Sequence, residues 1–316
     1  MKIERVKLGD IEAARERIAD SIVRTPLVRL NVDEHEIYLK LENLQPIGSF
    51  KLRGAGNAIA MATPEQLARG VYTASAGNMA QGVAWHARRL GIPCTVVVPE
   101  HAPETKLAAI TRLGGTFIKV PFAEWWQVLV NHGYPGLDGL FIHPVSDPAV
   151  IAGNGTIGLE ILEDLPDVDT VLVPYGGGGL SSGIATAVKT LRPQAKMIAC
   201  EVETSAAFAA ALKSGGVTKI DYIPSFVDGI GSGGVLEEMW PIASELLDGS
   251  IVMPLADVAE AVRILAERNR VIAEGAGATP VAAALSGRAG NGRIVCVVSG
   301  GNIDFEKLVK IFRREI

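Results

Sequence analysis

The 316-residue chain is poor in features that mark several classes of protein. Aromatic residues make up 5%, and the three cysteines, Cys94, Cys200 and Cys296, are far apart and each lies in an apolar run. This odd, scattered set argues against a disulfide scaffold, so we expect buried free thiols in a reducing compartment. Basic residues are not in excess, because the net charge is −5. The charge therefore gives no reason to expect nucleic acid or an anionic membrane as a partner.

Long apolar stretches are also missing. No run reaches the roughly 18 apolar residues that a membrane-spanning helix needs. Residues 1–25 have the pattern of a charged amphipathic helix and lack the apolar core of a signal peptide. We therefore expect a soluble, cytoplasmic protein.

Glycine, in contrast, is abundant. The chain has 35 glycines, about 11% of its residues, against roughly 7% in average proteins. They have no three-residue period, and 17 prolines are too few for a low-complexity linker. Many of these glycines must therefore serve sharp bends or close approaches of the backbone to a ligand.

Short β-branched runs alternate with longer helical patterns along the chain. The predicted strands are 70–74, 94–98, 116–120, 170–173, 197–202 and 294–298. The predicted helices are 78–90, 103–113, 148–165, 180–191 and 257–273. Such alternation predicts α/β architecture with parallel sheets covered by helices. A polar, proline-containing crossing at 143–148 separates two clusters of these units, so we predict two lobes with a ligand cleft between them.

The sharpest local signal is a glycine loop that follows the strand at 170–173. Four consecutive glycines, Gly176, Gly177, Gly178 and Gly179, precede a helical pattern. Free backbone N–H groups at a helix N-terminus favour a phosphate, although a tight turn alone is the alternative. The loop is not a Walker A motif, because no Lys-Ser or Lys-Thr follows. Two G-x-G-x-x-G matches, at 153–158 and 229–234, do not follow strands and are weak evidence for a dinucleotide.

Three further segments carry useful chemistry. Lys51 lies between Phe50 and Leu52 where a helix would begin. A lone helical lysine is usually a solvated charge, but one held among apolar side chains becomes a usable nucleophile or base. Residues 75–82 form a strand-to-helix turn whose donors suit a carboxylate, or whose Ser75 or Asn78 simply caps the helix. Ser299 ends the last predicted strand, at the edge where α/β proteins bind ligands.

In order and spacing, the segments from residue 24 to residue 302 resemble the fold-type II pyridoxal-phosphate enzymes, in the serine/threonine dehydratase and serine racemase branch. The resemblance implies a two-lobed, three-layer α/β/α fold like that of tryptophan synthase β, with pyridoxal 5′-phosphate as cofactor. Residues 1–45 and 146–316 would form the large cofactor-binding domain. Residues 46–145 would form a small mobile domain. The resemblance also implies a homodimer, the usual oligomeric state of the family.

The resemblance also implies roles for individual residues. Lys51 would form the Schiff base with the cofactor, and the 176–179 loop would hold the 5′-phosphate. The residues expected around the pyridine ring are Asn78, Gly229, Glu274 and Ser299. Those expected at the substrate carboxylate are Ser75, Ala76, Gly77 and Met79.

The implied reaction is removal of water from an L-β-hydroxy amino acid, of the L-threonine or L-serine type, to give a 2-oxo acid and ammonia. Ser299 would donate a hydrogen bond to the ring nitrogen without supplying a full proton, which favours prompt elimination. Racemases of this branch carry a second serine at position 76. Ala76 cannot transfer a proton, so we predict a dehydratase, with serine racemase as the alternative.

Four departures from the branch bear on the substrate. Met79 stands where His is usual, and Val145-Ser146 stands where a Phe is common. Asn154 replaces the usual Gln, and Tyr175 replaces a small aliphatic residue. Loss of an imidazole and a pocket phenyl would admit a bulkier substituent. Phenylserine is therefore the alternative substrate. Glu203 matches one carboxylate ligand of the branch's divalent metal site, but Ala209 stands where a second is expected, so we predict weak metal dependence at most.

Overall fold

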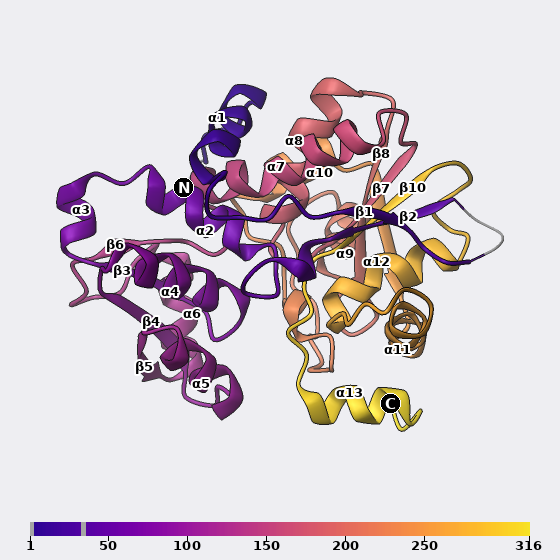
Figure 1. The fold of residues 1–316 in the computed structure, drawn as a ribbon. Helices are drawn as coiled ribbons and strands as arrows, with labels where there is room; N and C mark the ends of the chain where they lie inside the picture. The colour runs from indigo at the N-terminus through magenta and orange to yellow at the C-terminus, as the bar shows by residue number, and fades with distance from the viewer. Residues whose placement is uncertain (1–2, 33–35) are drawn as a thin grey trace.

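Two separate sheets form the computed structural model, which describes residues 3–32 and 36–316 (Figure 1). The larger sheet has six strands in the order β1-β2-β10-β7-β8-β9. Their bounds are β1 Leu27–Arg29, β2 Ile37–Leu41, β7 Thr170–Pro174, β8 Lys196–Val202, β9 Gly249–Met253 and β10 Ile294–Val298. All neighbours are parallel except β1 and β2.

The smaller sheet is wholly parallel, with the order β5-β4-β3-β6. Its strands are β3 Val71–Ala74, β4 Cys94–Pro99, β5 Thr116–Val120 and β6 Leu140–Phe141. The prediction of parallel α/β architecture is therefore confirmed, and all six predicted strands are present.

Helices cover both faces of each sheet. Those of the larger body are α1 Leu8–Ile18, α7 Pro148–Asp164, α8 Gly179–Leu191, α9 Ala207–Ser214, α10 Trp240–Leu246, α11 Leu255–Ile264, α12 Gly275–Leu285 and α13 Phe305–Phe312. Those of the smaller body are α2 Lys51–Ala60, α3 Pro64–Ala68, α4 Asn78–Leu90, α5 Glu104–Arg112 and α6 Phe122–Val130. Short turns of helix lie at η1 Glu42–Leu44, η2 Asp228–Ile230 and η3 Leu265–Asn269.

Strand alternation explains the three layers of the larger body. Leu172 packs in a core with α11, α12 and α13, whereas its neighbours Val171 and Val173 pack in a second core with α7, α8 and α9. Successive side chains of a strand point to opposite faces, so each strand feeds both cores. In the smaller body Val96 likewise faces α2, α4 and α5, while Val97 faces α6.

Strands β1, β2, β6 and β9 were not predicted. Strand β6 has two residues and β1 has three, and both are half-exposed, so neither gives the continuous apolar run of a buried strand. Strand β2 contains Lys40, a residue that ordinarily argues against burial.

The predicted helix over 257–273 is wrong at its C-terminal end. Helix α11 ends at Ile264 and a π-helical turn runs to Asn269, after which Arg270 has a φ of 61°. The apolar residues 271–273 belong to neither a helix nor a strand and lead to Glu274, the residue before α12. Val271 and Ala273 are buried, whereas Ile272 is 41% exposed, so an apolar pattern here does not indicate a continued helix.

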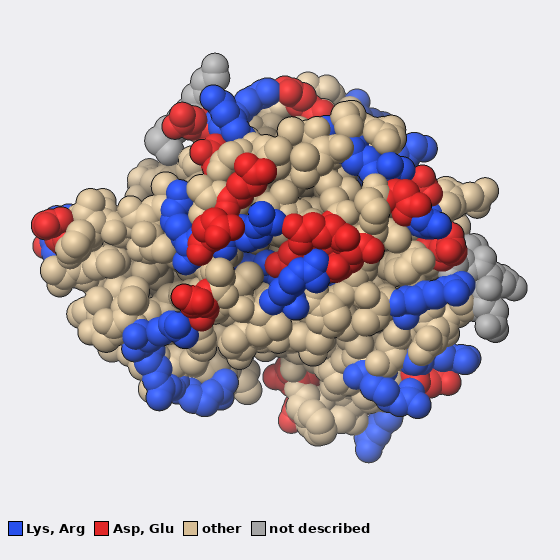
Figure 2. Space-filling view, turned by 45° about the horizontal axis from the view of Figure 1, so that its top comes forward, with Lys and Arg blue, Asp and Glu red and all other residues tan. Residues whose placement is uncertain are grey.

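The structure also bears on the cysteines, on membrane-spanning helices and on the surface charge. All three cysteines are buried and unpaired, as predicted. Among the residues described, no helix combines the length and apolarity that crossing a bilayer requires. Acidic and basic side chains are interspersed on the face shown in Figure 2. Residues 1–2 and 33–35 of the large domain predicted from 1–45 and 146–316 lie outside the described residues.

Candidate active site

A cavity of about 600 Å³ opens between the two bodies. It lies at the carboxyl ends of the strands, since Ala74, Pro174 and Ser299 line it at the ends of β3, β7 and β10. This is the edge at which open α/β sheets bind ligands. Every predicted cofactor or substrate residue lines this one cavity, namely Lys51, Ser75, Ala76, Gly77, Asn78, Met79, Gly176, Gly177, Gly178, Gly179, Gly229, Glu274 and Ser299. The fold therefore brings together residues that lie up to 248 positions apart in the chain.

The 176–179 loop joins β7 to the N-terminus of the 13-residue helix α8. Gly178 is the residue before this helix and has a φ of +92°, a conformation that side chains other than glycine rarely adopt. A Cβ on Gly179 would lie 2.4 Å from the backbone carbonyl oxygen of Val145. Glycine therefore allows the loop to pack on the 143–148 crossing while the first N–H groups of α8 stay free for an anion.

Lys51 is the first residue of α2 and is half-buried at the cavity. Its Nζ donates a hydrogen bond of 2.6 Å to the carbonyl oxygen of Pro144 and lies 5.1 Å from the centre of the Phe50 ring. Burial lowers the pKa of Lys51 to about 8, against an opposing effect of the Glu274 carboxylate. The amine can therefore lose its proton near neutral pH, which a nucleophile or base requires.

The 75–79 loop leaves the N-terminus of α4 open. Gly77 is the residue before the helix, and no side chain caps it. The Ser75 hydroxyl instead accepts a hydrogen bond of 3.1 Å from the backbone N–H of Gly77. The alternative interpretation, an N-cap by Ser75 or Asn78, is therefore wrong. The free N–H groups of the first turn of α4 can bind a carboxylate.

A chain of amides links the two bodies across the cavity. The Asn78 amide nitrogen donates to Glu274 Oε1 at 2.9 Å, and the Asn302 amide nitrogen donates to Asn78 Oδ1 at 2.8 Å. Burial raises the pKa of Glu274 to about 7, with a smaller contribution from the Asp228 carboxylate. Local sequence patterns do not indicate this role of Asn302, because its partner Asn78 lies 224 residues away in the chain.

The raised pKa of Glu274 makes stability depend on pH. The folded chain binds this proton more tightly than the unfolded chain, whose pKa is 4.5. Stability therefore falls between pH 4.5 and about pH 7, and the full loss of about 3 kcal/mol applies above pH 7. We expect Glu274→Gln to raise the unfolding free energy of the cofactor-free protein at pH 8 and to leave it unchanged at pH 4.5, in urea titrations. A difference that does not vary with pH would contradict this assignment.

Ser299 directly follows β10 in the chain, and its side chain is buried. Its carbonyl oxygen accepts a hydrogen bond of 3.0 Å from the backbone N–H of Phe50, and Ser49 forms a β-bridge with Gly300. The segment before Lys51 is therefore held against the segment that carries Ser299. These backbone contacts fix Lys51 and Ser299, the residues predicted to contact the cofactor aldehyde and the pyridine nitrogen, relative to each other.

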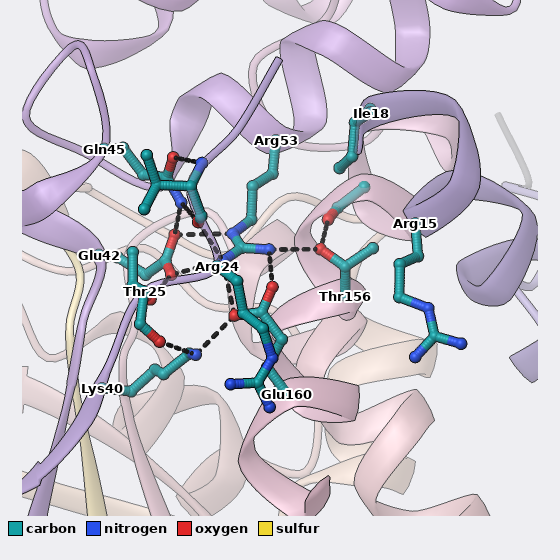
Figure 3. Close-up of polar contacts among 12 residues, drawn as sticks. Arg15, Ile18, Arg24, Thr25, Lys40, Glu42, Gln45, Arg53, Thr156 and Glu160 are labelled. Carbon is teal, nitrogen blue, oxygen red and sulfur yellow. Dashed lines mark hydrogen bonds and ion pairs between the residues drawn. The ribbon is translucent and has the colours of Figure 1, made fainter. Parts of the chain in front are cut away.

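A buried ion network anchors the helical turn that begins with Lys51 (Figure 3). Arg53 donates to Glu42 from Nε and Nη2, both at 2.8 Å, and to Glu160 from Nη1 at 2.7 Å and Nη2 at 2.9 Å. Lys40 Nζ donates to Glu160 at 2.5 Å and to the carbonyl oxygen of Thr25 at 2.6 Å. Arg53, Lys40 and Glu42 are fully buried. Two cations and two carboxylates thus balance in charge.

The electrostatics of the network favour its ionised form. Burial alone would raise the pKa of Glu42, but the adjoining Arg53 guanidinium, with Thr25 and Lys40, holds it below its usual range. Glu42 follows β2 and Glu160 lies in α7, both in the larger body. The first turn of α2 is therefore fixed to the larger body, and with it the backbone of Lys51. Sequence reasoning missed this network, although Glu160 within an otherwise apolar helical run was a readable signal.

Glu203, the predicted weak metal candidate, lies at the N-terminus of α11. Its Oε1 accepts a hydrogen bond of 2.9 Å from the backbone N–H of Leu255 at the start of α11. Within residues 3–32 and 36–316, the spacing of a metal site occurs only at His132, His143 and Glu238. His143 Nδ1 accepts hydrogen bonds from the backbone N–H groups of residues 145 and 146. Its other nitrogen then carries the proton in the neutral ring, which opposes metal binding.

We therefore expect a chelator to have little effect. Holoenzyme dialysed against EDTA should retain its activity within about twofold, because one carboxylate engaged with a helix N-terminus is a poor site for Mg²⁺ or Ca²⁺. Steady-state rates with and without added Mg²⁺ measure this. Loss of activity in EDTA and recovery with Mg²⁺ would contradict the expectation.

The cavity's donor set fits pyridoxal 5′-phosphate. An anion-binding helix N-terminus at the 176–179 loop suits the phosphate, the Lys51 amine suits the aldehyde carbon, and the Ser299 hydroxyl suits the pyridine nitrogen. These groups come from α8, α2 and β10, and all line the same 600 Å³ space. Binding of one phosphate-bearing cofactor explains why the four glycines and Lys51 line the same cavity.

Comparison with known proteins leads to the same cofactor. Residues 18–300 match the model of the family "Pyridoxal-phosphate dependent enzyme". The chain is 40% identical to an L-threonine ammonia-lyase of Thermotoga maritima over 98% of this chain and 79% of that protein. It superposes on maize serine racemase with a TM-score of 0.90, at 31% identity over 99% and 98% of the two chains. A threonine deaminase of Solanum lycopersicum gives 0.87, at 33% identity over 99% and 96%. The chain therefore belongs to the pyridoxal-phosphate dependent enzymes, with the fold-type II architecture.

Proposed function

We propose that this chain is a pyridoxal-phosphate-dependent dehydratase, or ammonia-lyase, for L-β-hydroxy amino acids of the threonine and serine type. The observation that carries the proposal is Lys51, a half-buried amine with a pKa of about 8 in the same cavity as the 176–179 loop and Ser299. The similarity to threonine ammonia-lyase and threonine deaminase supports it.

The net reaction converts the substrate into a 2-oxo acid and ammonium. The β-hydroxyl leaves as water as the α-proton is removed, and one water is taken up when the released unsaturated amine hydrolyses. Pyridoxal phosphate, when bound, supplies a ring that accepts negative charge from the substrate α-carbon. The protein supplies every other element of the reaction.

Each side chain has a defined task in this scheme. The neutral Lys51 amine takes the α-proton, and its lowered pKa keeps it available near neutral pH. The N-terminus of α4 and the 75–79 loop hold the substrate carboxylate, and the N-terminus of α8 holds the phosphate. Asn78, fixed by Glu274 and Asn302, would hold the ring oxygen of the bound cofactor. When the cofactor is bound, the Ser299 hydroxyl would donate a hydrogen bond to the ring nitrogen without giving it a full proton.

Dehydration rather than racemisation follows from Ala76, because a racemase needs a second acid or base on the opposite face of the site. Ala76 lines the cavity and has no group that can carry a proton. We expect the holoenzyme to convert L-serine into pyruvate and ammonium with no D-serine, and Ala76→Ser to gain D-serine formation. Chiral chromatography of the reaction mixture measures both. D-serine from the unaltered enzyme at a rate comparable to pyruvate would favour the racemase alternative.

We further propose that the enzyme is a cytoplasmic homodimer. Residues 46–145 would form a small mobile domain that moves relative to the first turn of α2, which the Arg53 contacts hold to the larger body. The buried, unpaired thiols support a reducing compartment. The exposed ring of Phe305, 77% accessible in the single chain, supports a covering partner. Light scattering should give twice the chain mass of 33.3 kDa, and a value near 33.3 kDa would exclude the dimer.

A further inference from the structure

We propose that α6 forms a subsite for an apolar, preferably aromatic, β-substituent of the substrate. The inference rests on the proposed function and specifies the substrate class of the same site. Three side chains of this helix, Phe122, Trp125 and Trp126, line the cavity that contains Lys51, and we call them the aromatic wall.

The wall is a built surface rather than a set of scattered rings. The Phe122 and Trp125 ring centres lie 5.5 Å apart, and those of Trp125 and Trp126 lie 6.5 Å apart. Both tryptophans are half-buried and pack on the core that includes Ala74 and Leu129. Phe122 remains 61% exposed. The chain has only 4 Trp, 5 Tyr and 8 Phe, so three aromatic rings of one nine-residue helix at this cavity are a marked concentration.

The wall lies beside the substrate-binding loop. Ala74, against which α6 packs, is the last residue of β3 and directly precedes the 75–79 loop. Met79, at 1% exposure, adds an unbranched apolar side chain to the same lining. A substrate held by its carboxylate at this loop can therefore direct its β-substituent toward α6.

Helix α6 offers no charged side chain to a polar substituent on its side of the cavity. The one charged residue of α6, Glu124, does not line the cavity and accepts a hydrogen bond of 2.8 Å from the Tyr134 hydroxyl. Charged residues of the lining come from other segments, namely Lys51, Lys106, Arg112, Asp228, Glu274, Asp304 and Lys307. A methyl group would contact little of the aromatic wall, whereas a phenyl ring would stack on it and displace water.

The test compares L-serine, L-threonine and L-phenylserine in the holoenzyme and three variants. Trp126→Ala and Phe122→Ala each remove part of the wall, and Phe122 is exposed enough that folding should be unaffected. Trp85→Ala is the matched control, because this half-buried tryptophan of α4 does not line the cavity. We expect kcat/KM for L-phenylserine to exceed that for L-threonine by about tenfold or more. Each wall variant should lower the phenylserine value by about 10- to 100-fold and leave serine within about threefold.

Two outcomes would overturn the inference alone. One is efficient turnover of serine or threonine with poor turnover of phenylserine. The other is a phenylserine preference that the wall variants leave unchanged. If no hydroxy amino acid is turned over, the proposed function fails, and calorimetric titration of the holoenzyme still tests the wall. L-phenylalanine should then bind more tightly than L-alanine, and Trp126→Ala should remove that difference. Equal affinities would overturn the inference.

Discussion

Replacing Lys51 by alanine should lower kcat by at least about a thousandfold. The variant loses both the amine that bonds the cofactor and the base that takes the α-proton, and a positioned base alone contributes about 10²- to 10⁴-fold. Stopped-flow or endpoint assays of 2-oxo acid release measure the rate. The structure gives a physical reason why no other side chain takes over, because the burial that lowers the pKa of this amine is specific to its position at the start of α2.

A second readout separates loss of chemistry from loss of folding. Borohydride should fix the cofactor to the unaltered protein at the peptide that contains Lys51, and it should leave the cofactor unattached to the protein in Lys51→Ala. Lys106→Ala is the matched control, since Lys106 lines the same cavity but pairs with Asp228 at 3.0 Å. It should keep activity within a few-fold. Retained activity in Lys51→Ala, or cofactor fixed at another lysine, would remove the basis of the mechanism.

Replacing Arg53 by alanine should lower the unfolding free energy by about 3–5 kcal/mol. The change leaves Glu42 and Glu160 buried with only Lys40 to balance them, and it removes hydrogen bonds that occupy the whole guanidinium group. Arg53→Lys should recover only part of the loss, because an ammonium group cannot bind two carboxylates in the bidentate manner. Urea titrations of the cofactor-free proteins measure the differences.

The matched control for this prediction is Arg24→Ala. Arg24 also binds two carboxylates, those of Glu163 and Asp164, but its side chain is 52% exposed. Its loss should cost no more than about 1 kcal/mol. Equal effects of the two substitutions would show that burial does not set the strength of the network, and the anchoring of the Lys51 turn would need another explanation.

The sequence predicted best those parts of the site whose signals come from residues adjacent in the chain. The setting of Lys51 was readable because Phe50 and Leu52 are its neighbours in the chain, and the 176–179 loop was readable because four glycines between a strand and a helix have few purposes. Gly179 shows the limit of such reasoning. Its missing side chain accommodates the Val145 carbonyl oxygen, which lies 34 residues away in the chain and is invisible to local pattern.

What could not be predicted depends on contacts between distant segments. The Pro144 carbonyl that accepts from Lys51 is a backbone group, so no residue type signals it. The aromatic wall reads in the sequence as an ordinary apolar helix, and only the packing of α6 beside β3 turns its rings toward the cavity. The helix end after Asn269 was missed because Val271, Ile272 and Ala273 continue the apolar pattern although the helix has ended.

The most direct test of the account is a product balance for the holoenzyme. Purified enzyme incubated separately with L-serine, L-threonine and L-phenylserine should release 2-oxo acid and ammonium in equal amounts, leave no D-isomer, and stop after borohydride treatment. Recovery of the D-isomer without 2-oxo acid, or release of no product from any of the three, would contradict the assignment of this chain as a dehydratase.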